Sequence, residues 1–257
     1  MRILCCVKQV PDLDLMRMDP ETGSLIRSGV PAIMNPMDYY AISAAVKLKQ
    51  QYGGTVTLIT MGPPLAEEVL REALALGCDD AILLTDRAFG NADTLATSYS
   101  ILMGAKMKGE YDVIVCGKES LDGATGQMAS QLAQRFGASM LSACIEVLEM
   151  DELGRSITVK RNTDSGIETV KAKLPCLLTV EKEYFPESRA TLKSKLFALD
   201  APVSVIPAAD IPELDMSRVG DKGSPTKVPR MFPPSVPQAG EILGSTSAFI
   251  EKVRTFM

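Results

Sequence analysis

The sequence of 257 residues contains no histidine and no tryptophan, and aromatic residues make up only 5% of it. The absence of histidine excludes Ser-His-Asp and Cys-His catalytic relays, imidazole ligands for zinc, and an imidazole base that titrates near neutral pH. Redox or group-transfer chemistry at neutral pH would therefore have to come from a bound cofactor.

The chain also lacks the patterns of metal-cluster, nucleic-acid-binding and membrane-inserted proteins. Its six cysteines are scattered without a C-x-x-C pair, and several lie inside apolar runs, so we expect reduced, buried thiols, no metal site and a cytoplasmic protein. A formal net charge of −5 argues against a nucleic-acid partner. No apolar run reaches transmembrane length, so we expect no membrane insertion.

The first 140 residues alternate short apolar runs with segments of helical spacing. We expect strands at residues 2–7, 55–61, 81–84 and 112–116. Helix starts follow at Asn35-Pro36, after Pro63-Pro64, at Asp93 and near Met128. This alternation is typical of βαβ units and predicts an α/β fold, with an open, mostly parallel Rossmann-like sheet and helices on both faces.

The pattern changes after about residue 140. Strand candidates at residues 144–150, 156–161, 167–173 and 177–182, with turn signals at Leu153-Gly154 and Ser165-Gly166, predict antiparallel strands added to one edge of the sheet. From about residue 200 prolines interrupt the chain. We therefore expect an α/β domain at 1–200 and an extended C-terminal arm at 201–257 that is ordered against a partner; a disordered tail is the alternative.

The loops between strands and helices are the candidate site, because open parallel sheets bind ligands at the carboxyl ends of their strands. The loop at residues 117–126 places small and hydroxyl-bearing residues before a helix N-terminus, which favours a phosphate. It matches neither the dinucleotide fingerprint nor the Walker loop, so a purely structural role stays open. Thr94 and Thr97 are either hydroxyl donors to a ligand or simple capping and surface residues.

Seven short motifs follow one another along nearly the whole chain. They are VKQVPD at 7–12, NPMD at 35–38, MGPP at 61–64, GNADT at 90–94, CGKESLDGATGQ at 116–127, LPCLLTV at 174–180 and RATL at 189–192. In this order and spacing the sequence resembles the β subunit of an electron transfer flavoprotein. The resemblance implies a nucleotide site in this chain, which holds FAD in the electron-bifurcating branch of the family and AMP in the other branch.

The resemblance also implies roles for single residues. The stretch 86–98 resembles the bifurcating version, which cradles the FAD diphosphate and lies near the NADH site, so FAD is favoured over AMP. Arg87, Phe89 and Gly90 are then expected in the vicinity of NADH. The expected cofactor-binding residues are Cys6, Asn35, Asp38, Met61, Asp93, Thr94, Thr97, Gly117, Lys118, Asp122, Gly123, Ala124, Thr125, Gly126 and Gln127.

Several partners follow from the same resemblance. An α subunit carries the other FAD, and the proline-rich arm would pack on it. Ala190, Thr191 and Leu192 correspond to the family's docking loop for an acyl-CoA dehydrogenase. Because the residues that follow, 193–196, depart from the family pattern, a lactate-type flavin dehydrogenase is the alternative partner. Ferredoxin or flavodoxin is the expected low-potential acceptor.

The predicted function is that of an electron-transfer subunit that binds FAD and passes electrons from NADH by bifurcation, in complex with the α subunit and a dehydrogenase. No side chain is expected to act as a catalyst, since the flavin supplies the chemistry. Two alternatives stay open. One is a non-bifurcating subunit that holds a structural AMP. The other is an ATP-using ligase or amidotransferase, whose usual SGG-x-DS-type loop is replaced here by VKQVPD.

Overall fold

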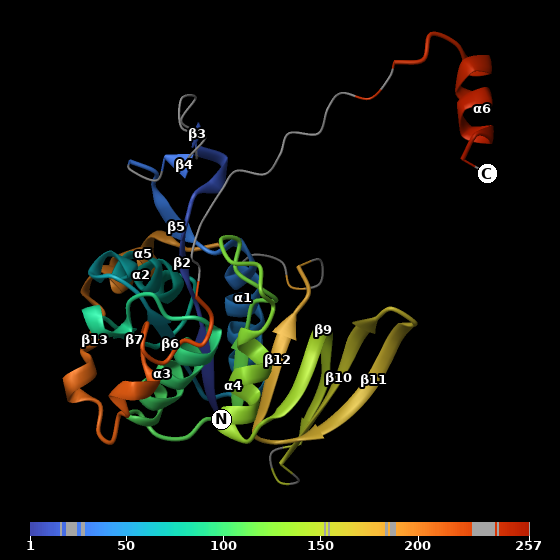
Figure 1. The fold of residues 1–257 in the computed structure, drawn as a ribbon. Coiled ribbons are helices and arrows are strands. Elements are labelled where there is room, and N and C mark those ends of the chain that lie inside the picture. Colours follow the sequence, from blue (N-terminus) through green and yellow to red (C-terminus); the bar gives the residue numbers. More distant parts are fainter. Residues whose placement is uncertain are drawn as a thin grey trace.

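The computed structural model describes residues 1–15, 17–18, 25–26, 29–151, 153, 155–182, 185, 189–227, 240 and 242–256. In this part of the chain the main sheet has nine strands in the order β11-β10-β9-β12-β8-β1-β6-β7-β13 (Figure 1). The strands are β1 (Arg2–Cys6), β6 (Thr55–Met61), β7 (Asp80–Leu84), β8 (Val113–Cys116), β9 (Ser139–Asp151), β10 (Ser156–Thr163), β11 (Gly166–Lys173), β12 (Cys176–Val180) and β13 (Val203–Ile206). Two short pairs lie outside it: β2 (Gln9–Pro11) with β5 (Ala32–Met34), and β3 (Arg17–Met18) with β4 (Leu25–Ile26).

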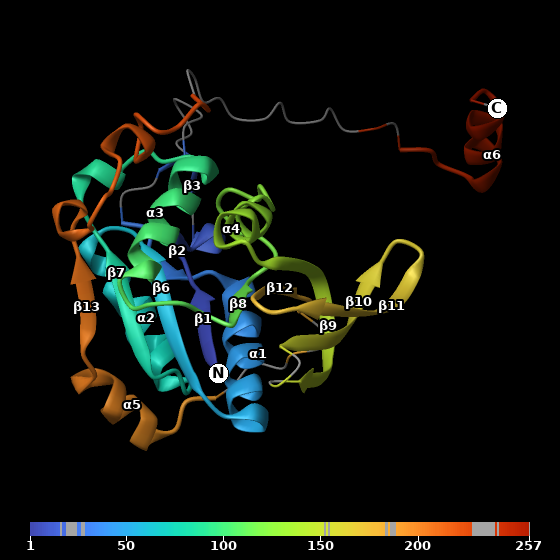
Figure 2. The same cartoon turned by 90° about the horizontal axis from the view of Figure 1, so that it is seen from below.

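Helices cover both faces of this sheet, as the alternating pattern predicts. They are α1 (Pro36–Tyr52), α2 (Glu67–Ala75), α3 (Thr94–Lys106), α4 (Met128–Phe136) and α5 (Leu192–Asp200). A further helix, α6 (Thr246–Arg254), does not cover the sheet. One buried cluster includes residues of α1, α2 and α5, and a second cluster includes residues of α3 and α4. Figure 2 shows α3 and α4 on one side of the sheet and α1, α2 and α5 on the other. In the described residues no helix is long and apolar enough to cross a membrane.

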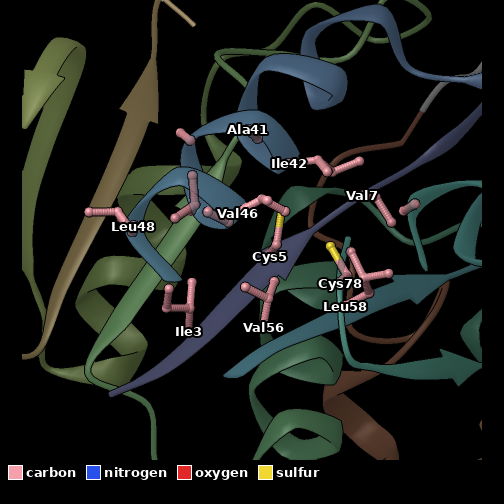
Figure 3. Packing of buried hydrophobic residues seen from close by; sticks show 14 of the residues in the cluster. Ile3, Cys5, Val7, Ala41, Ile42, Val46, Leu48, Val56, Leu58 and Cys78 are labelled. Atoms are coloured by element: carbon pink, nitrogen blue, oxygen red, sulfur yellow. The ribbon is translucent and has the colours of Figure 1, made fainter. Parts of the chain in front are cut away.

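The alternation of side chains along β1 explains how one strand serves both faces. Ile3 and Cys5 belong to the cluster under α1 and α2, whereas Leu4 belongs to the cluster under α3 and α4. Figure 3 shows side chains of α1 packed against Ile3 and Cys5. The six cysteines are free, and five of them are buried; burial raises the pKa of the Cys5 thiol well above its usual range. Cys6 is only half-buried.

Local sequence signals set the boundaries of the helices that lead away from the sheet. The helix α1 follows Asn35, begins with Pro36 and ends at Tyr52, directly before Gly53, which has a φ of 76°. Before α3 the carboxylate of Asp93 accepts a hydrogen bond from the backbone N–H of Ala96 at 3.0 Å. These boundaries confirm the predicted helix starts at Asn35-Pro36 and at Asp93.

The strand β12 corrects the expectation that all strands after residue 140 are antiparallel edge additions. It lies inside the sheet and pairs in parallel with β8 on one side and with β9 on the other. All five of its residues are buried, as expected for a strand covered on both faces. The antiparallel prediction holds for β10, which pairs with both β9 and β11. Gly154, in the predicted turn before β10, lies outside the described residues.

The first part of the expected C-terminal arm belongs to the α/β body. The strand β13 pairs in parallel with β7 over four residues, and Ile211 and Val219 beyond it are buried. Pro202 and Pro207 directly flank this strand, so they bound it without removing a hydrogen bond from its interior. Residues 228–239, with the prolines at positions 229, 233, 234 and 237, lie outside the described residues. Residues 246–254 of the expected extended arm form the helix α6, and Figures 1 and 2 show it away from the body.

Candidate functional site

A cavity of about 1130 Å³ lies at the carboxyl ends of β1, β6 and β8. Cys6, Met61 and Cys116, the last residues of these three strands, line it. The position is the one at which open α/β sheets bind ligands. Its volume exceeds the roughly 300–1,000 Å³ of most small-molecule sites, so the cavity has room for a long ligand such as a dinucleotide.

The side chain of Asn35 connects the start of α1 to the loop after β8. Asn35 occupies the cap position of α1, yet its side chain makes no capping hydrogen bond. Its Nδ2 instead donates to Asp38 Oδ1 at 2.9 Å and to the carbonyl oxygen of Glu119 at 3.0 Å. Its Oδ1 accepts from the backbone N–H of Leu121 at 3.0 Å. The buried amide is therefore fully used in fixing the loop at residues 117–127.

Asp38 places a buried carboxyl group at the wall of the cavity. Its Oδ2 accepts a hydrogen bond from the backbone N–H of Lys8 at 2.8 Å, and only 5% of the residue is exposed. Burial raises the pKa of Asp38 to about 7, although the hydrogen bonds from Asn35 and Lys8 act in the opposite direction. The charge of this group therefore changes near neutral pH.

Gly117 lets the loop after β8 pass directly over the start of α1. A Cβ atom at this position would lie 2.5 Å from Asp38 Oδ1 and 3.0 Å from Met37 Cβ. Because atoms do not approach so closely, the site needs a glycine here for steric reasons. Gly117 does not line the cavity, so in this structure its role is to set the path of the loop at residues 117–127.

The N-termini of α3 and α4 meet at the cavity. The hydroxyl of Thr94 donates to Gln127 Oε1 at 3.1 Å and accepts from Gln131 Nε2 at 3.1 Å, and Thr94, Thr97 and Gln127 all line the cavity. The Asp93 carboxylate caps α3, so neither threonine is the cap of this helix, and their contact with a ligand stays a prediction. Free backbone N–H groups at helix N-termini favour a phosphate or another anion.

Lys8 is a site residue that the sequence reasoning did not select. It lies two residues beyond the end of β1 and lines the cavity, and its Nζ lies 2.7 Å from Asp122 Oδ1 and 3.4 Å from Ser120 Oγ. Partial burial raises the pKa of Asp122, but the Lys8 ammonium together with the hydrogen bonds from Ser120 and the backbone outweighs this effect and holds the pKa below its usual range. A charged residue at the end of an otherwise apolar strand was the signal that could have identified Lys8.

Residues 220–227 form a further wall of the cavity. The backbone N–H of Asp93 donates to Ser224 Oγ at 2.8 Å, and Asp93 Oδ2 accepts from the N–H of Thr226 at 3.1 Å. Gly220 has a φ of +55°, and a Cβ there would lie 2.0 Å from the carbonyl oxygen of Ala88. Asp221, Thr226 and Lys227 line the cavity from this segment. They were missed because the prolines around them favoured an extended arm.

The structure brings most of the predicted cofactor-binding residues to one cavity. Gly117, Asp122 and Ala124 are not among the residues that line it, and of the residues predicted near NADH, Phe89 lines it whereas Arg87 and Gly90 do not. The predicted residues that do line it are Cys6, Asn35, Asp38, Met61, Asp93, Thr94, Thr97, Lys118, Gly123, Thr125, Gly126 and Gln127.

The predicted docking residues lie outside the cavity, at the start of α5. Thr191 caps this helix, and its side chain and that of Ser194 form a reciprocal capping box. Leu192 is 76% exposed, so its side chain is available to a partner. The capping box also explains why residues 193–195 are helical.

Comparison with known proteins identifies the family. The family model described as "Electron transfer flavoprotein domain" matches residues 22–211. Protein FixA of Azorhizobium caulinodans is 41% identical over 239 residues, which cover 91% of this chain and 85% of FixA. The electron transfer flavoprotein subunit beta of Clostridium acetobutylicum is 43% identical over 243 residues, covering 95% and 92% of the two chains. The caffeyl-CoA reductase-Etf complex subunit CarD of Acetobacterium woodii is 40% identical over 248 residues, covering 96% and 93%. The chain therefore belongs to the electron transfer flavoprotein family.

Proposed function

We propose that this chain is the β subunit of an electron-bifurcating electron transfer flavoprotein and that its cavity holds FAD. In the complex, electrons would pass from NADH toward a partner flavin dehydrogenase and toward ferredoxin or flavodoxin. The observation that carries the proposal is the cavity itself. It has a volume of about 1130 Å³, and it lies at the carboxyl edge of the sheet beside the N-termini of α3 and α4.

The residues present fit a nucleotide that carries a diphosphate. Thr94 and Thr97 add hydroxyl groups to the N-terminus of α3, and Lys118 adds a positive charge to the loop beside it. Each of these groups stabilises negative charge on phosphate oxygens. A bound flavin would supply hydride acceptance and single-electron transfer. The protein's own part is to position this cofactor and to keep its surroundings fixed.

Two features constrain the environment of the cofactor. The Asp38 carboxyl, whose pKa is about 7, can hold or release a proton at Oδ1 or Oδ2 at the cavity wall near neutral pH. Lys8 is held by Asp122 and Ser120, so its charge has a defined position. We assign the Phe89 side of the cavity to the NADH vicinity, because Phe89 is the member of the predicted NADH group that lines it.

The alternative is a non-bifurcating subunit that holds AMP and supports transfer through the FAD of the α subunit. The cavity volume favours FAD, since a single nucleotide leaves much of the space unfilled. The test is a count of bound nucleotides in the purified α–β heterodimer after acid release. Two FAD per heterodimer are expected. One FAD together with one AMP would overturn the bifurcating proposal and leave the family assignment unaffected.

The proposed partners are an α subunit and a flavin dehydrogenase. The relative CarD is named as a subunit of a caffeyl-CoA reductase-Etf complex, which supports a partner that acts on a CoA thioester. A lactate-type dehydrogenase is the alternative. We place the docking contact at Ala190, Thr191 and Leu192, supported by the exposure of Leu192. The segment beyond Lys227, with α6, would pack on the α subunit. The six free cysteines support a cytoplasmic location.

A further inference from the structure

A second pocket, of about 550 Å³, is built by α3, α4 and the segment at residues 212–218. Its lining shares no residue with the cofactor cavity among the residues described. Tyr99, Arg135 and Arg218 contribute to it, together with Lys106 and Glu213. The volume lies within the roughly 300–1,000 Å³ that small-molecule sites occupy.

The ring of Tyr99 holds two guanidinium groups at this pocket. Arg218 Cζ lies 4.0 Å from the ring centroid, and Arg135 Cζ lies 5.5 Å from it. The ring is fixed in turn, because Tyr99 is only 5% exposed and its hydroxyl accepts a hydrogen bond from the backbone N–H of Asp215 at 3.0 Å. The two cations are therefore placed before any ligand arrives.

Arg135 is anchored from behind and leaves part of its guanidinium for a ligand. Its Nε donates to Ser98 Oγ at 2.8 Å, and its Nη2 donates to the carbonyl oxygen of Leu95 at 2.9 Å. Neither Arg135 nor Arg218 forms an ion pair in the part of the chain that the structure describes. An arginine fork with free N–H groups in a pocket matches the oxygens of a phosphate group.

The charges around the pocket favour an anion with more than one negative charge. Partial burial lowers the pKa of Arg135, and the nearby positive charge of Arg218 lowers it further. Among the residues that line the pocket, three cations face one carboxylate, that of Glu213. Arg218 also interacts with the Asp215 carboxylate, but this group is exposed, lies outside the lining and is hydrogen-bonded to Ser217. A bound dianion would relieve the repulsion between the two guanidiniums.

We propose that this pocket is a second anion site, which binds a small phosphate-bearing molecule between Arg135 and Arg218, with Lys106 at its rim. The site is separate from the nucleotide cavity and does not depend on which nucleotide that cavity holds. Its ligand class follows from the two guanidinium forks and the excess of positive charge.

The test uses the purified α–β heterodimer with its bound nucleotide and inorganic phosphate and pyrophosphate as probes, titrated by calorimetry. We expect saturable binding of one probe molecule per heterodimer. Arg218→Gln, which removes the positive charge but leaves a polar side chain at this exposed position, should weaken it at least tenfold. Arg135→Lys keeps the charge but loses the fork, and should weaken it as well. The matched control Arg155→Gln removes the same charge from an exposed arginine elsewhere on the chain and should leave the affinity unchanged.

Other outcomes would overturn the proposal. Equal affinity of the wild type and Arg218→Gln would show that the pocket does not bind the probe. A loss of binding in Lys118→Gln with no loss in Arg218→Gln would place the probe in the nucleotide cavity instead. Absence of saturable binding to the heterodimer would overturn the proposal directly. Thermal unfolding of each variant identifies any that has lost its fold. If Arg218→Gln has lost its fold, the affinity of Arg135→Lys for the probe decides whether the proposal holds.

Discussion

Substituting Gly117 tests whether the binding loop depends on its close approach to Asp38. In Gly117→Ala the new methyl group would lie 2.5 Å from Asp38 Oδ1, which cannot swing away freely because Asn35 and the Lys8 backbone hold the carboxyl group. Either the carboxyl loses a hydrogen bond or the loop moves outward. Overpacking of this kind costs about 1–3 kcal/mol. We expect a loss of this size in the free energy of unfolding, together with a lower nucleotide content.

Gly123→Ala is the matched control, because it adds the same methyl group to the same loop. The nearest atom to its Cβ would be Ser120 Oγ at 3.4 Å, an ordinary contact. Urea unfolding should therefore be close to that of the wild type. The two variants are compared by their unfolding in the heterodimer, because Gly123 itself lines the cavity.

A double substitution separates the clash from other effects of the alanine. When Asp38→Ala removes the carboxylate, the added methyl at position 117 meets mainly Met37 Cβ, so its cost should fall by about 1 kcal/mol or more. Additive costs in Gly117→Ala, Asp38→Ala and the double variant would refute the reasoning. Equal behaviour of Gly117→Ala and Gly123→Ala would refute it as well.

Three further predictions follow from the cavity and the C-terminal segment. Thr94→Val removes both hydrogen bonds of the hydroxyl, worth about 0.5–1.5 kcal/mol each, and should speed nucleotide release several-fold in a dilution assay; unchanged release would contradict its role. Because the pKa of Asp38 is raised to about 7, the folded chain binds a proton that the unfolded chain releases near pH 4. The free energy of unfolding should fall as the pH rises from about 4 to 7, by at most about 4 kcal/mol, and Asp38→Asn should flatten this dependence in urea titrations. Truncation after Lys227 should leave a folded body that no longer co-purifies with the α subunit, whereas truncation after Asp200, which also removes β13, should destabilise the body itself.

The parts of the site that were predictable share one physical cause. Cys6 and Met61 end apolar strands, and parallel strands bring their carboxyl ends to the same edge, so the residues that follow them had to converge. The start of α3 could be predicted equally well, because the cap at Asp93 is a local interaction between residues three apart. Hydrophobic periodicity and helix capping are encoded within a few residues, so they can be recognised in the sequence without knowledge of the fold.

The parts that were missed depend on contacts between distant segments. The strand β12 returns between β8 and β9, and its parallel pairing there cannot be inferred from the chain order of the strands. Asn35 matched a helix cap, but its side chain serves the loop at residues 117–127, which lies more than eighty residues later in the chain. Ser224 and Thr226 carry no local signal at all, and only their bonds to Asp93 reveal them.

The wall at residues 220–227 has a consequence for how the protein is made. Chains emerge from the ribosome N-terminus first, and domains fold as their residues become available. The strand ends and helix N-termini of the cavity are complete well before Asp221, Thr226 and Lys227 are synthesised. Until then Asp93 lacks two of its hydrogen-bond partners, and one side of the cavity stays open to water. We therefore expect stable nucleotide binding in the cavity only after residues 220–227 have been synthesised.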